Sequence, residues 1–235
     1  MILKELENTF TYILWLVFFL KTKTVAVPLD MATDSIDDMF DGCWSKAASV
    51  IDLFGVFERH FNRNFGIAWA SAESSARHPV LMHLKEDHAT VVYMYTKVKD
   101  IQHDFNQAVN TGKQKYGTYR FKFHFFYFYL TDDIRVLRPN QTSCRTTYHR
   151  TRKHFDDNHS FDFNGNVSCF EIYSCFGADI THYCATNQMG QVLIPPYEVF
   201  KITDVLTDDP WCIVIYKTYK SQPNHLCYVL GLFKP

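Results

Sequence analysis

The period of the hydrophobic pattern changes at Pro139, and this change limits the possible folds more than any other feature of the sequence. Before Pro139, apolar residues recur every three or four positions, as they do on one face of a helix. After it, short segments rich in Val, Ile, Thr, Tyr and Phe alternate with Pro, Asn, Asp and Gly, which is typical of strands and turns. Helices in one half of a chain and strands in the other indicate an α+β fold.

The pattern places the individual elements. The first helix is expected to begin at a cap formed by Asp34 or Ser35, and Gly112 is well placed to end a helix. The segment 89–96 fits either a helix or a strand, and a helix is favoured over 115–137. The expected helical segments are 34–51, 57–75, 101–109 and 115–137, and the expected strands are 146–150, 167–174, 192–194, 198–206, 211–219 and 226–232.

Aromatic residues are abundant, with 21 Phe and 14 Tyr in 235 residues, and they can build a large core. The aromatic run 119–129 fits a ligand surface or core packing, and core packing is the default. The formal net charge is −1, so no global positive field would attract nucleic acid or an anionic membrane. His149, His154 and His159 recur every five residues, so a metal site is conceivable, but this spacing suits neither one helix face nor a tight turn. No CxxC pair occurs either, and no metal is expected.

The first 26 residues have the features of a signal peptide. The apolar run Phe10–Leu20 is too short to span a bilayer comfortably, and Thr24-Val25-Ala26 supplies small residues for cleavage. A signal peptide 1–26 is favoured over a signal anchor, which stays open. The C-terminal sequence CYVLGLFKP is too short for a lipid-anchor signal. These features predict a secreted or cell-surface protein.

An extracellular location changes how the cysteines are interpreted. Seven cysteines in an oxidising compartment allow up to three disulfides and one free thiol. Three tripeptides also fit the acceptor pattern for N-glycosylation, and they begin at Asn140, Asn158 and Asn166.

Four strings resemble one family, the vertebrate arginine-specific mono-ADP-ribosyltransferases, and the fish-type members most of all. They are PLDMATDSIDDMFDGC (28–43), DFNQAVNTGKQKY (104–116), CFEIYSCFGADI (169–180) and QVLIPPYEVFKIT (191–203). The resemblance spans about 28–230, and the last two strings together are highly specific.

The resemblance implies a helical N-terminal lobe, 27–140, on a two-sheet catalytic lobe, 141–235, in one domain. It implies NAD or NADP as a cosubstrate in the cleft between them, with no permanently bound cofactor, and protein arginines as acceptors. A monomer is expected. It also implies the disulfides Cys43–Cys227 and Cys144–Cys175, which leaves Cys169, Cys184 and Cys212, mostly as buried free thiols.

Family members transfer ADP-ribose from NAD to an arginine guanidinium, with positive charge developing on the ribose. A carboxylate beside the ribose stabilises that charge, and a second one, two residues earlier, orients and helps deprotonate the acceptor. This E-x-E motif precedes the VLIPP strand and falls here on Met189-Gly190-Gln191. Gln191 carries no charge, and Met189 can neither orient nor deprotonate a guanidinium.

Two further family positions differ. The Tyr-Arg arginine that pairs with the pyrophosphate becomes His149; Arg150 follows it but should face the other way unless a one-residue bulge turns it. Only 20 residues lie between Tyr148 and Cys169, and they contain no Ser-x-Ser strand. Ser160 is the one serine in the segment 154–166 and is interpreted as a loop residue.

Three functions are consistent with these observations. The first is an NAD(P)+–protein-arginine ADP-ribosyltransferase, a glycosyltransferase, with little or no remaining activity. The second is a catalytically dead secreted binding or decoy protein on the same fold. The third is an NAD glycohydrolase, which needs no arginine but still needs a carboxylate at position 191.

Overall fold

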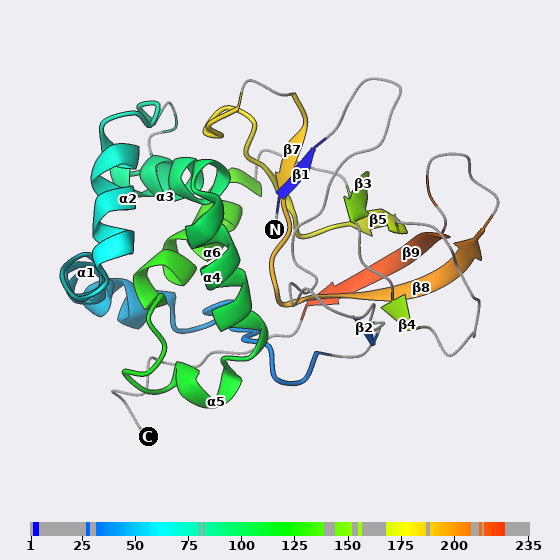
Figure 1. Ribbon diagram of the computed structural model, residues 1–235, viewed down its shortest axis with the longest axis horizontal. Coiled ribbons are helices and arrows are strands. Elements are labelled where there is room, and N and C mark those ends of the chain that lie inside the picture. The colour runs from blue at the N-terminus through cyan, green and yellow to red at the C-terminus, as the bar shows by residue number, and fades with distance from the viewer. Residues whose placement is uncertain are drawn as a thin grey trace.

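The computed structural model describes residues 2–4, 27–28, 32–79, 81, 83–138, 144–151, 155–156, 168–186, 189–207, 212 and 214–223. Helices gather on one side of the molecule and strands on the other (Figure 1). The helices are α1 (Trp44–Phe61), α2 (Arg63–Glu73), α3 (Glu86–Lys97), α4 (Lys99–Asn110), α5 (Lys113–Tyr116) and α6 (His124–Leu137). This arrangement confirms the α+β fold class.

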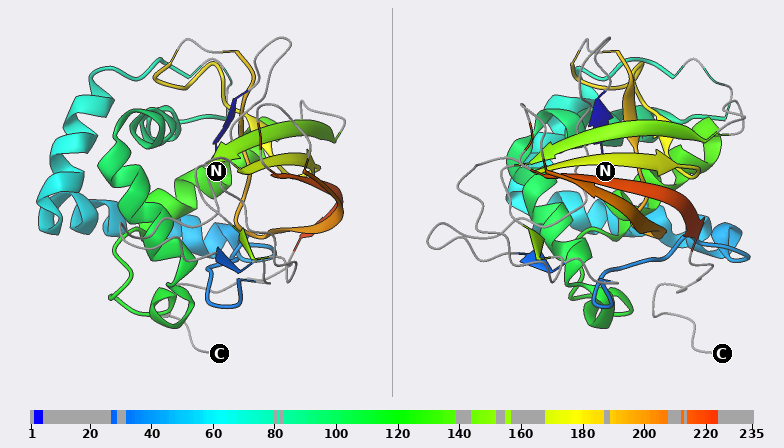
Figure 2. Two further views of the ribbon diagram at one scale, coloured as in Figure 1. Left: turned by 45° about the vertical axis from the view of Figure 1, so that its right-hand side comes forward. Right: turned by 90° about the vertical axis from the view of Figure 1, so that its right-hand side faces the viewer.

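The strands form a four-stranded and a three-stranded sheet, with a separate two-stranded pair. The larger sheet has the order β3-β5-β9-β8, in which only β5 and β9 run parallel, and Figure 2 shows it beside the helices. Its strands are β3 (Arg145–Thr151), β5 (Ser168–Ser174), β8 (Glu198–Leu206) and β9 (Val214–Pro223). The smaller sheet is antiparallel, β1-β7-β6: β1 (Ile2–Lys4), β7 (Gln191–Leu193) and β6 (Ala178–Asp179). The pair joins β2 (Val27–Pro28) to β4 (Phe155–Asp156) in parallel.

α6 is the centre of the helical side. Five consecutive aromatic residues, 125–129, are each at most 2% exposed, so this helix is buried on every face. The rings meet edge to face, as Phe105 and Phe126 do with centroids 5.0 Å apart. Tyr127, Leu130 and Ile134 of α6 face β7 and the residues after it across a gap of only about 10 Å³. Core packing is therefore confirmed for Phe121 and for residues 123–129, whereas Tyr119, at the start of the aromatic run 119–129, is 77% exposed and is not core.

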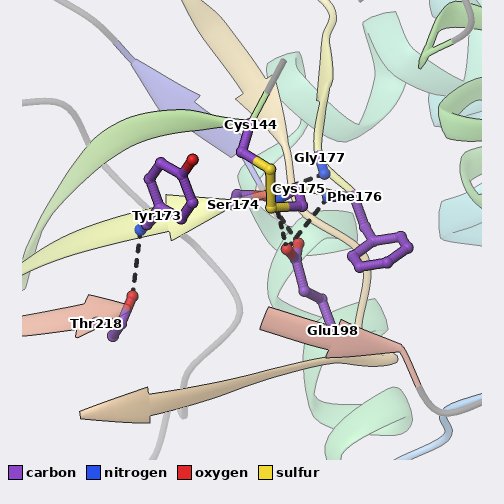
Figure 3. Close-up of a disulfide and its surroundings, with 8 residues drawn as sticks. All are labelled: Cys144, Tyr173, Ser174, Cys175, Phe176, Gly177, Glu198 and Thr218. Atoms are coloured by element: carbon purple, nitrogen blue, oxygen red, sulfur yellow. Dashed lines mark hydrogen bonds between the residues drawn. A yellow bond between two sulfur atoms is a disulfide. The ribbon is translucent and has the colours of Figure 1, made fainter. Parts of the chain in front are cut away.

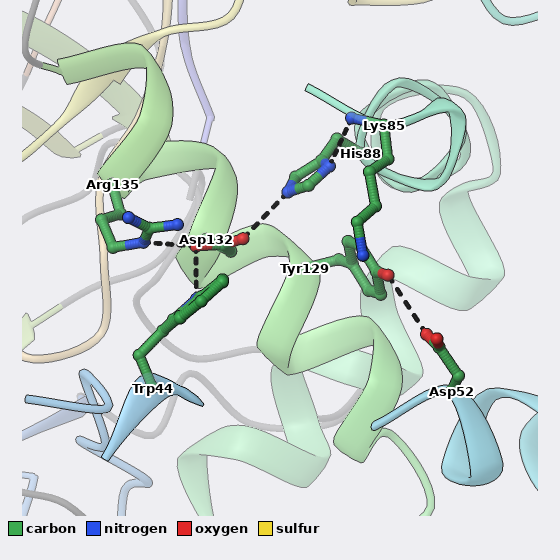
Figure 4. Close-up of polar contacts among 7 residues, drawn as sticks. All are labelled: Trp44, Asp52, Lys85, His88, Tyr129, Asp132 and Arg135. Atoms are coloured by element: carbon green, nitrogen blue, oxygen red, sulfur yellow. Dashed lines mark hydrogen bonds and ion pairs between the residues drawn. The ribbon is translucent and has the colours of Figure 1, made fainter. Parts of the chain in front are cut away.

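A buried carboxylate joins three helices (Figure 4). Asp132 of α6 accepts hydrogen bonds from Trp44 Nε1 at 2.7 Å, His88 Nε2 at 3.0 Å and Arg135 Nε at 2.5 Å. His88 Nδ1 accepts the backbone N–H of Lys85 at 3.0 Å, so the imidazole proton lies on Nε2, the atom that donates to Asp132. Burial opposes ionisation of Asp132, but the hydrogen bonds from His88 and Arg135 outweigh it and lower the pKa of this carboxyl.

The structure corrects the expected start of the first helix. Residues 34–43 are not helical, and α1 begins at Trp44. Phe40 and Gly42 have φ values of +58° and +72°, which no right-handed helix accommodates. Tertiary contacts hold this turn: Asp38 is buried, its carboxylate accepts the Tyr116 hydroxyl at 3.0 Å, and its backbone carbonyl accepts the Tyr127 hydroxyl at 2.7 Å.

Other predicted boundaries also shift. The segment 57–75 is divided at Asn62, whose side chain accepts the N–H of Phe65 at 3.2 Å and so caps α2. The ambiguous segment 89–96 lies within helix α3. In 115–137, only α6 and the end of α5 are helical, and 117–123 is irregular. The expected strands 146–150, 167–174, 192–194, 198–206 and 211–219 correspond to β3, β5, β7, β8 and β9, whereas 226–232 lies outside the described residues.

Candidate functional site

Gln191 begins β7 and is only 4% exposed. Its backbone carbonyl accepts the N–H of Ile180 at 2.7 Å, and its own N–H donates to Thr181 Oγ1 at 2.8 Å. Its side-chain Nε2 donates to Thr186 Oγ1. The side chain of Gln191, the predicted position of the family carboxylate, is therefore a buried, neutral amide that is fixed by the segment between β6 and β7.

That segment is itself attached to the helices. The backbone N–H of Ala185 donates to Thr96 Oγ1 of α3 at 2.9 Å, and Arg77 Nη1 donates to the carbonyl of His182 at 2.8 Å. Gln191 thus lies where the helical side of the molecule meets the small sheet.

Asp179 is the carboxylate nearest to Gln191 in strand register. It pairs with Val192, and its oxygens accept the N–H of Thr181 at 2.9 Å and Arg145 Nη1 at 3.3 Å. Because directly paired residues share a face and neighbours along a strand alternate, Asp179 projects to the face opposite Gln191. Asp179 therefore does not replace the missing carboxylate.

The other half of the E-x-E position lies in solvent. Met189 is 78% exposed, and Gly190 has a φ of +71°, a value that favours glycine. A thioether side chain at this place offers an acceptor guanidinium neither a charge nor a strong hydrogen-bond acceptor. Of the two residues that the sequence analysis assigns to the E-x-E motif, Met189 is therefore exposed and Gln191 is buried, and both are uncharged.

His149 and Arg150 lie on opposite faces of β3. All seven pairs between β3 and β5 follow one continuous register, so no bulge interrupts β3 within this ladder. Thr147 and His149 are buried and Arg150 is half-exposed, as the alternation of a regular strand requires. His149 lies beside Phe170, with ring centroids 6.1 Å apart. The side chain of Arg150 therefore leaves β3 on the face opposite to that of His149.

A disulfide joins Cys144, before β3, to Cys175, after β5, and this is the pair that the family resemblance implies (Figure 3). Cys43 is also disulfide-bonded, and Cys227, its expected partner, lies outside the described residues. The expectation for the remaining cysteines is partly wrong. Cys169 and Cys212 form a disulfide, whereas Cys184 is a buried free thiol whose pKa is raised by that burial.

Glu198 is a buried carboxylate that the sequence analysis did not single out. It opens β8 and accepts hydrogen bonds from Ser174 Oγ at 2.8 Å and from the backbone N–H groups of Cys175 at 2.8 Å and Phe176 at 3.2 Å (Figure 3). These bonds tie the start of β8 to the turn that follows β5, next to the disulfide. Glu198 belongs to the YEVF part of a family-like string, which was the only available signal.

Several sequence predictions fall outside the described residues. These are the three glycosylation acceptors Asn140, Asn158 and Asn166, and Ser160. Within the described ranges, no group of His, Cys, Asp and Glu is arranged to hold a metal ion. No helix in the same ranges has the length and apolarity needed to cross a membrane.

Comparison with known proteins places this site in a family. The family model described as NAD:arginine ADP-ribosyltransferase matches residues 29–163 and 155–222. The chain is 25% identical to chicken NAD(P)(+)–arginine ADP-ribosyltransferase 2, over 88% of this chain and 74% of the relative. It is 27% identical to rat ecto-ADP-ribosyltransferase 5, over 94% and 80%.

The fold is similar to that of the eukaryotic mono-ADP-ribosyltransferase ART2.2, with a TM-score of 0.65 and 24% identity over 86% of this chain and 97% of that one. A mutant of ART2.2 in complex with NAD gives a TM-score of 0.67. Since the family model covers most of the sequence, the chain belongs to the NAD:arginine ADP-ribosyltransferase family.

Proposed function

We propose that this protein is a secreted member of the arginine mono-ADP-ribosyltransferase family in which arginine transfer is much reduced or lost. The observation that carries the proposal is the buried amide of Gln191, held by Thr186 and accompanied by no carboxylate on its face of the small sheet among the described residues. NAD or NADP is the proposed cosubstrate, bound without a permanent cofactor, and protein arginines are the proposed acceptors of any remaining activity.

The physical reason is the charge of the transition state. As nicotinamide leaves, positive charge develops on the ribose, and a buried carboxylate beside it stabilises that charge without reorganisation. An amide retains hydrogen bonding but lacks the charge. Loss of one such preorganised group costs about 3–4 kcal/mol, or a hundred- to a thousandfold in rate.

The other differences lower activity further. At the position of the family arginine, His149 presents an imidazole to a pyrophosphate where a bidentate guanidinium would be stronger. Met189 removes the group that would orient the acceptor. A protein with these replacements is better suited to binding a ligand or partner than to group transfer, so a catalytically inactive secreted binding protein is the second function that these replacements favour.

Extracellular location is part of the proposal. The supporting observations are the disulfides among the described residues and the signal-like sequence of 1–26, which we propose to precede one domain at 27–235. Strand β1 (Ile2–Lys4) lies within this segment, so its removal would leave β7 and β6 as the small sheet. Glycosylation at Asn140, Asn158 and Asn166 would agree with secretion.

Transfer of labelled ADP-ribose from NAD to polyarginine tests the function. The wild-type protein should label polyarginine at least a hundredfold more slowly than an intact family member. Met189→Glu combined with Gln191→Glu should raise the rate by at least tenfold. Gln114→Glu, which makes the same Gln-to-Glu change at an exposed position of α5 and adds one of the two charges, should leave it unchanged.

Each result distinguishes one possibility. Wild-type labelling at the rate of an intact relative would contradict the proposal. Nicotinamide release without labelling would instead assign the protein as an NAD glycohydrolase. If the double variant binds NAD but stays inactive, His149 and the absent serine strand are the dominant losses.

A further inference from the structure

A cavity in the helical side of the molecule encloses about 650 Å³ and is separate from Gln191. It lies between the C-terminal half of α1, the start of α2 and the segment between α5 and α6, and we call it the α1 pocket. α1 lies on the side of the helical layer away from β7 (Figure 1). Its volume is within the range of about 300–1,000 Å³ that is usual for small-molecule sites.

The floor of the α1 pocket is aromatic. Phe54, Phe121 and Phe123 line it, and each is at most 8% exposed. Phe123 belongs to the core through edge-to-face contact with Phe105, at 5.7 Å between centroids. The floor is therefore a rigid apolar surface that is held from behind by the main core.

The polar groups of the floor carry little net charge. The Glu58 carboxyl accepts the backbone N–H groups of Phe125 at 2.7 Å and Phe126 at 3.3 Å, and burial raises the pKa of this group well above its ordinary value. His124 Nε2 donates to the carbonyl of Tyr116 at 2.8 Å, and burial lowers the pKa of the imidazole, which favours its neutral form.

The rim exposes large aromatic rings to water. Phe57, Phe61 and Tyr119 are 46%, 76% and 77% exposed. Phe57 stacks on Phe61 at 5.7 Å, and Tyr119 stacks on buried Phe54 at 6.5 Å. Three exposed rings gathered around one cavity form an apolar patch of the kind that marks binding sites.

Positive charge predominates at the rim. Arg63 and Lys122 line the pocket and are exposed, and Asp104 is the one exposed carboxylate among its lining residues. Arg120, also exposed, lies in the same segment as Lys122, and exposed Lys115 lies in the preceding helix α5. The local field therefore favours an anion near an aromatic cavity.

We propose that the α1 pocket binds a small amphipathic anion. The apolar body lies against Phe54, Phe57 and Phe61, and the carboxylate or sulfonate group faces Arg63 and Lys122. Burial of the ligand's apolar body against these aromatic rings stabilises the complex, and the two cations favour a ligand with a negative charge.

Fluorescence titration of the full-length secreted protein with 1-anilinonaphthalene-8-sulfonate tests the site, with dodecanoate as a competitor. One saturable site that dodecanoate displaces is expected. Phe57→Ala combined with Phe61→Ala should weaken binding about tenfold. These rings are partly or largely exposed, so the fold should tolerate their removal, which circular dichroism checks. Leu53→Ala and Ile67→Ala truncate exposed apolar residues outside the pocket and should leave binding unchanged.

Charge is tested separately from apolar contact. Arg63→Glu combined with Lys122→Glu should weaken dodecanoate binding about fivefold and reduce its salt dependence, whereas Lys115→Glu should have a smaller effect. Absence of saturable binding would overturn the proposal, as would equal losses in the Leu53 and Ile67 controls. Dodecanol competing as well as dodecanoate would overturn the assignment of an anion.

Discussion

Asp132 and Gln191 are both 4% exposed, yet these two buried polar side chains differ in their charge and in the number of side chains that bind them. Asp132 stays ionised because three side chains on α1, α3 and α6 donate hydrogen bonds to it. Gln191 has one side-chain partner among the described residues, Thr186, and it is neutral. The comparison indicates that the structure keeps a buried anion where it joins helices, and a neutral amide at residue 191, where we propose that active family members carry a carboxylate.

Removing the carboxylate of Asp132 should have the largest effect. Asp132→Ala leaves the donors of Trp44, His88 and Arg135 without their shared acceptor, and breaking a buried charge pair typically costs about 3–5 kcal/mol. Urea unfolding should show this loss in the free energy of unfolding. Asp100→Ala, at an exposed site in α4, is the matched control, with a change below about 1 kcal/mol expected. Similar losses of unfolding free energy in both variants would mean that Asp132 contributes no more to stability than an exposed carboxylate does.

The same carboxylate predicts a dependence on pH. The folded pKa of Asp132 lies below its ordinary value of 3.8, so its stabilisation is present above about pH 4 and is lost as pH falls through the lower folded pKa. Asp132→Asn should flatten the acid limb of a plot of unfolding free energy against pH. An unchanged acid limb would show that other carboxylates dominate acid unfolding.

Packing around α6 should be the next most sensitive feature. A Cβ at Gly55 would lie 2.4 Å from the Phe125 ring, so Gly55→Ala forces a buried aromatic ring to move and should cost about 2–3 kcal/mol. Gly117→Ala meets no atom within 4 Å, and its backbone φ is negative, so it should be neutral or slightly stabilising. Thermal unfolding compares the two variants directly.

Introducing a charge at the candidate site should lower the unfolding free energy by less than these changes, and its dependence on pH reports whether the site can hold an anion. Gln191→Glu buries a carboxylate with one hydroxyl donor, compared with three donors at Asp132, so its pKa should rise. We expect a loss of about 2 kcal/mol at pH 7 that shrinks toward pH 5, where protonation removes the buried charge. Urea unfolding at both pH values measures this difference. Equal stability of the variant and wild type at pH 7 would show that the site already supplies enough donors for an anion.

The smallest effect is expected for Thr186→Val. The side-chain amide of Gln191 loses its acceptor, but Thr186 is exposed and water can replace the hydroxyl, so about 0.5–1 kcal/mol is expected. Combined with Gln191→Glu, the same change should cost clearly more, since the carboxylate then loses its one side-chain donor. An additive double variant would show that Thr186 does not act on residue 191.

Local sequence pattern predicted the features that depend on neighbouring residues. The α+β class, the strand β8 and the helical nature of α4 follow from spacing and residue type. The start of α1 did not, because two tyrosines far along the chain bind Asp38 and hold 34–43 in a turn. The broken helix in 115–137 is a similar case, since α6 begins where Glu58 of α1 accepts its first N–H groups.

In the candidate site too, features set by neighbouring residues differ from features set by distant contacts. The assignment of the E-x-E motif to Met189-Gly190-Gln191 stays a prediction that rests on the adjoining VLIPP string, but the sequence does show that all three residues are uncharged. The partners of Gln191 could not be found from sequence, because Thr181 and Thr186 reach it only through a turn between two short strands. The Cys169–Cys212 disulfide could not be found either, since it depends on β5 and β9 pairing in parallel across a long crossover.

The two disulfides attach β5 at both of its ends, to Cys144 on one side and to Cys212 on the other. They close loops of 31 and 43 residues, and on the chain-entropy model each is worth about 4 kcal/mol. On the proposed secretory route, much of the stability of the larger sheet would thus be supplied in an oxidising organelle, in addition to what its packing provides. Synthesis in a bacterial cytosol should therefore yield chains with intact helices and an unfinished sheet.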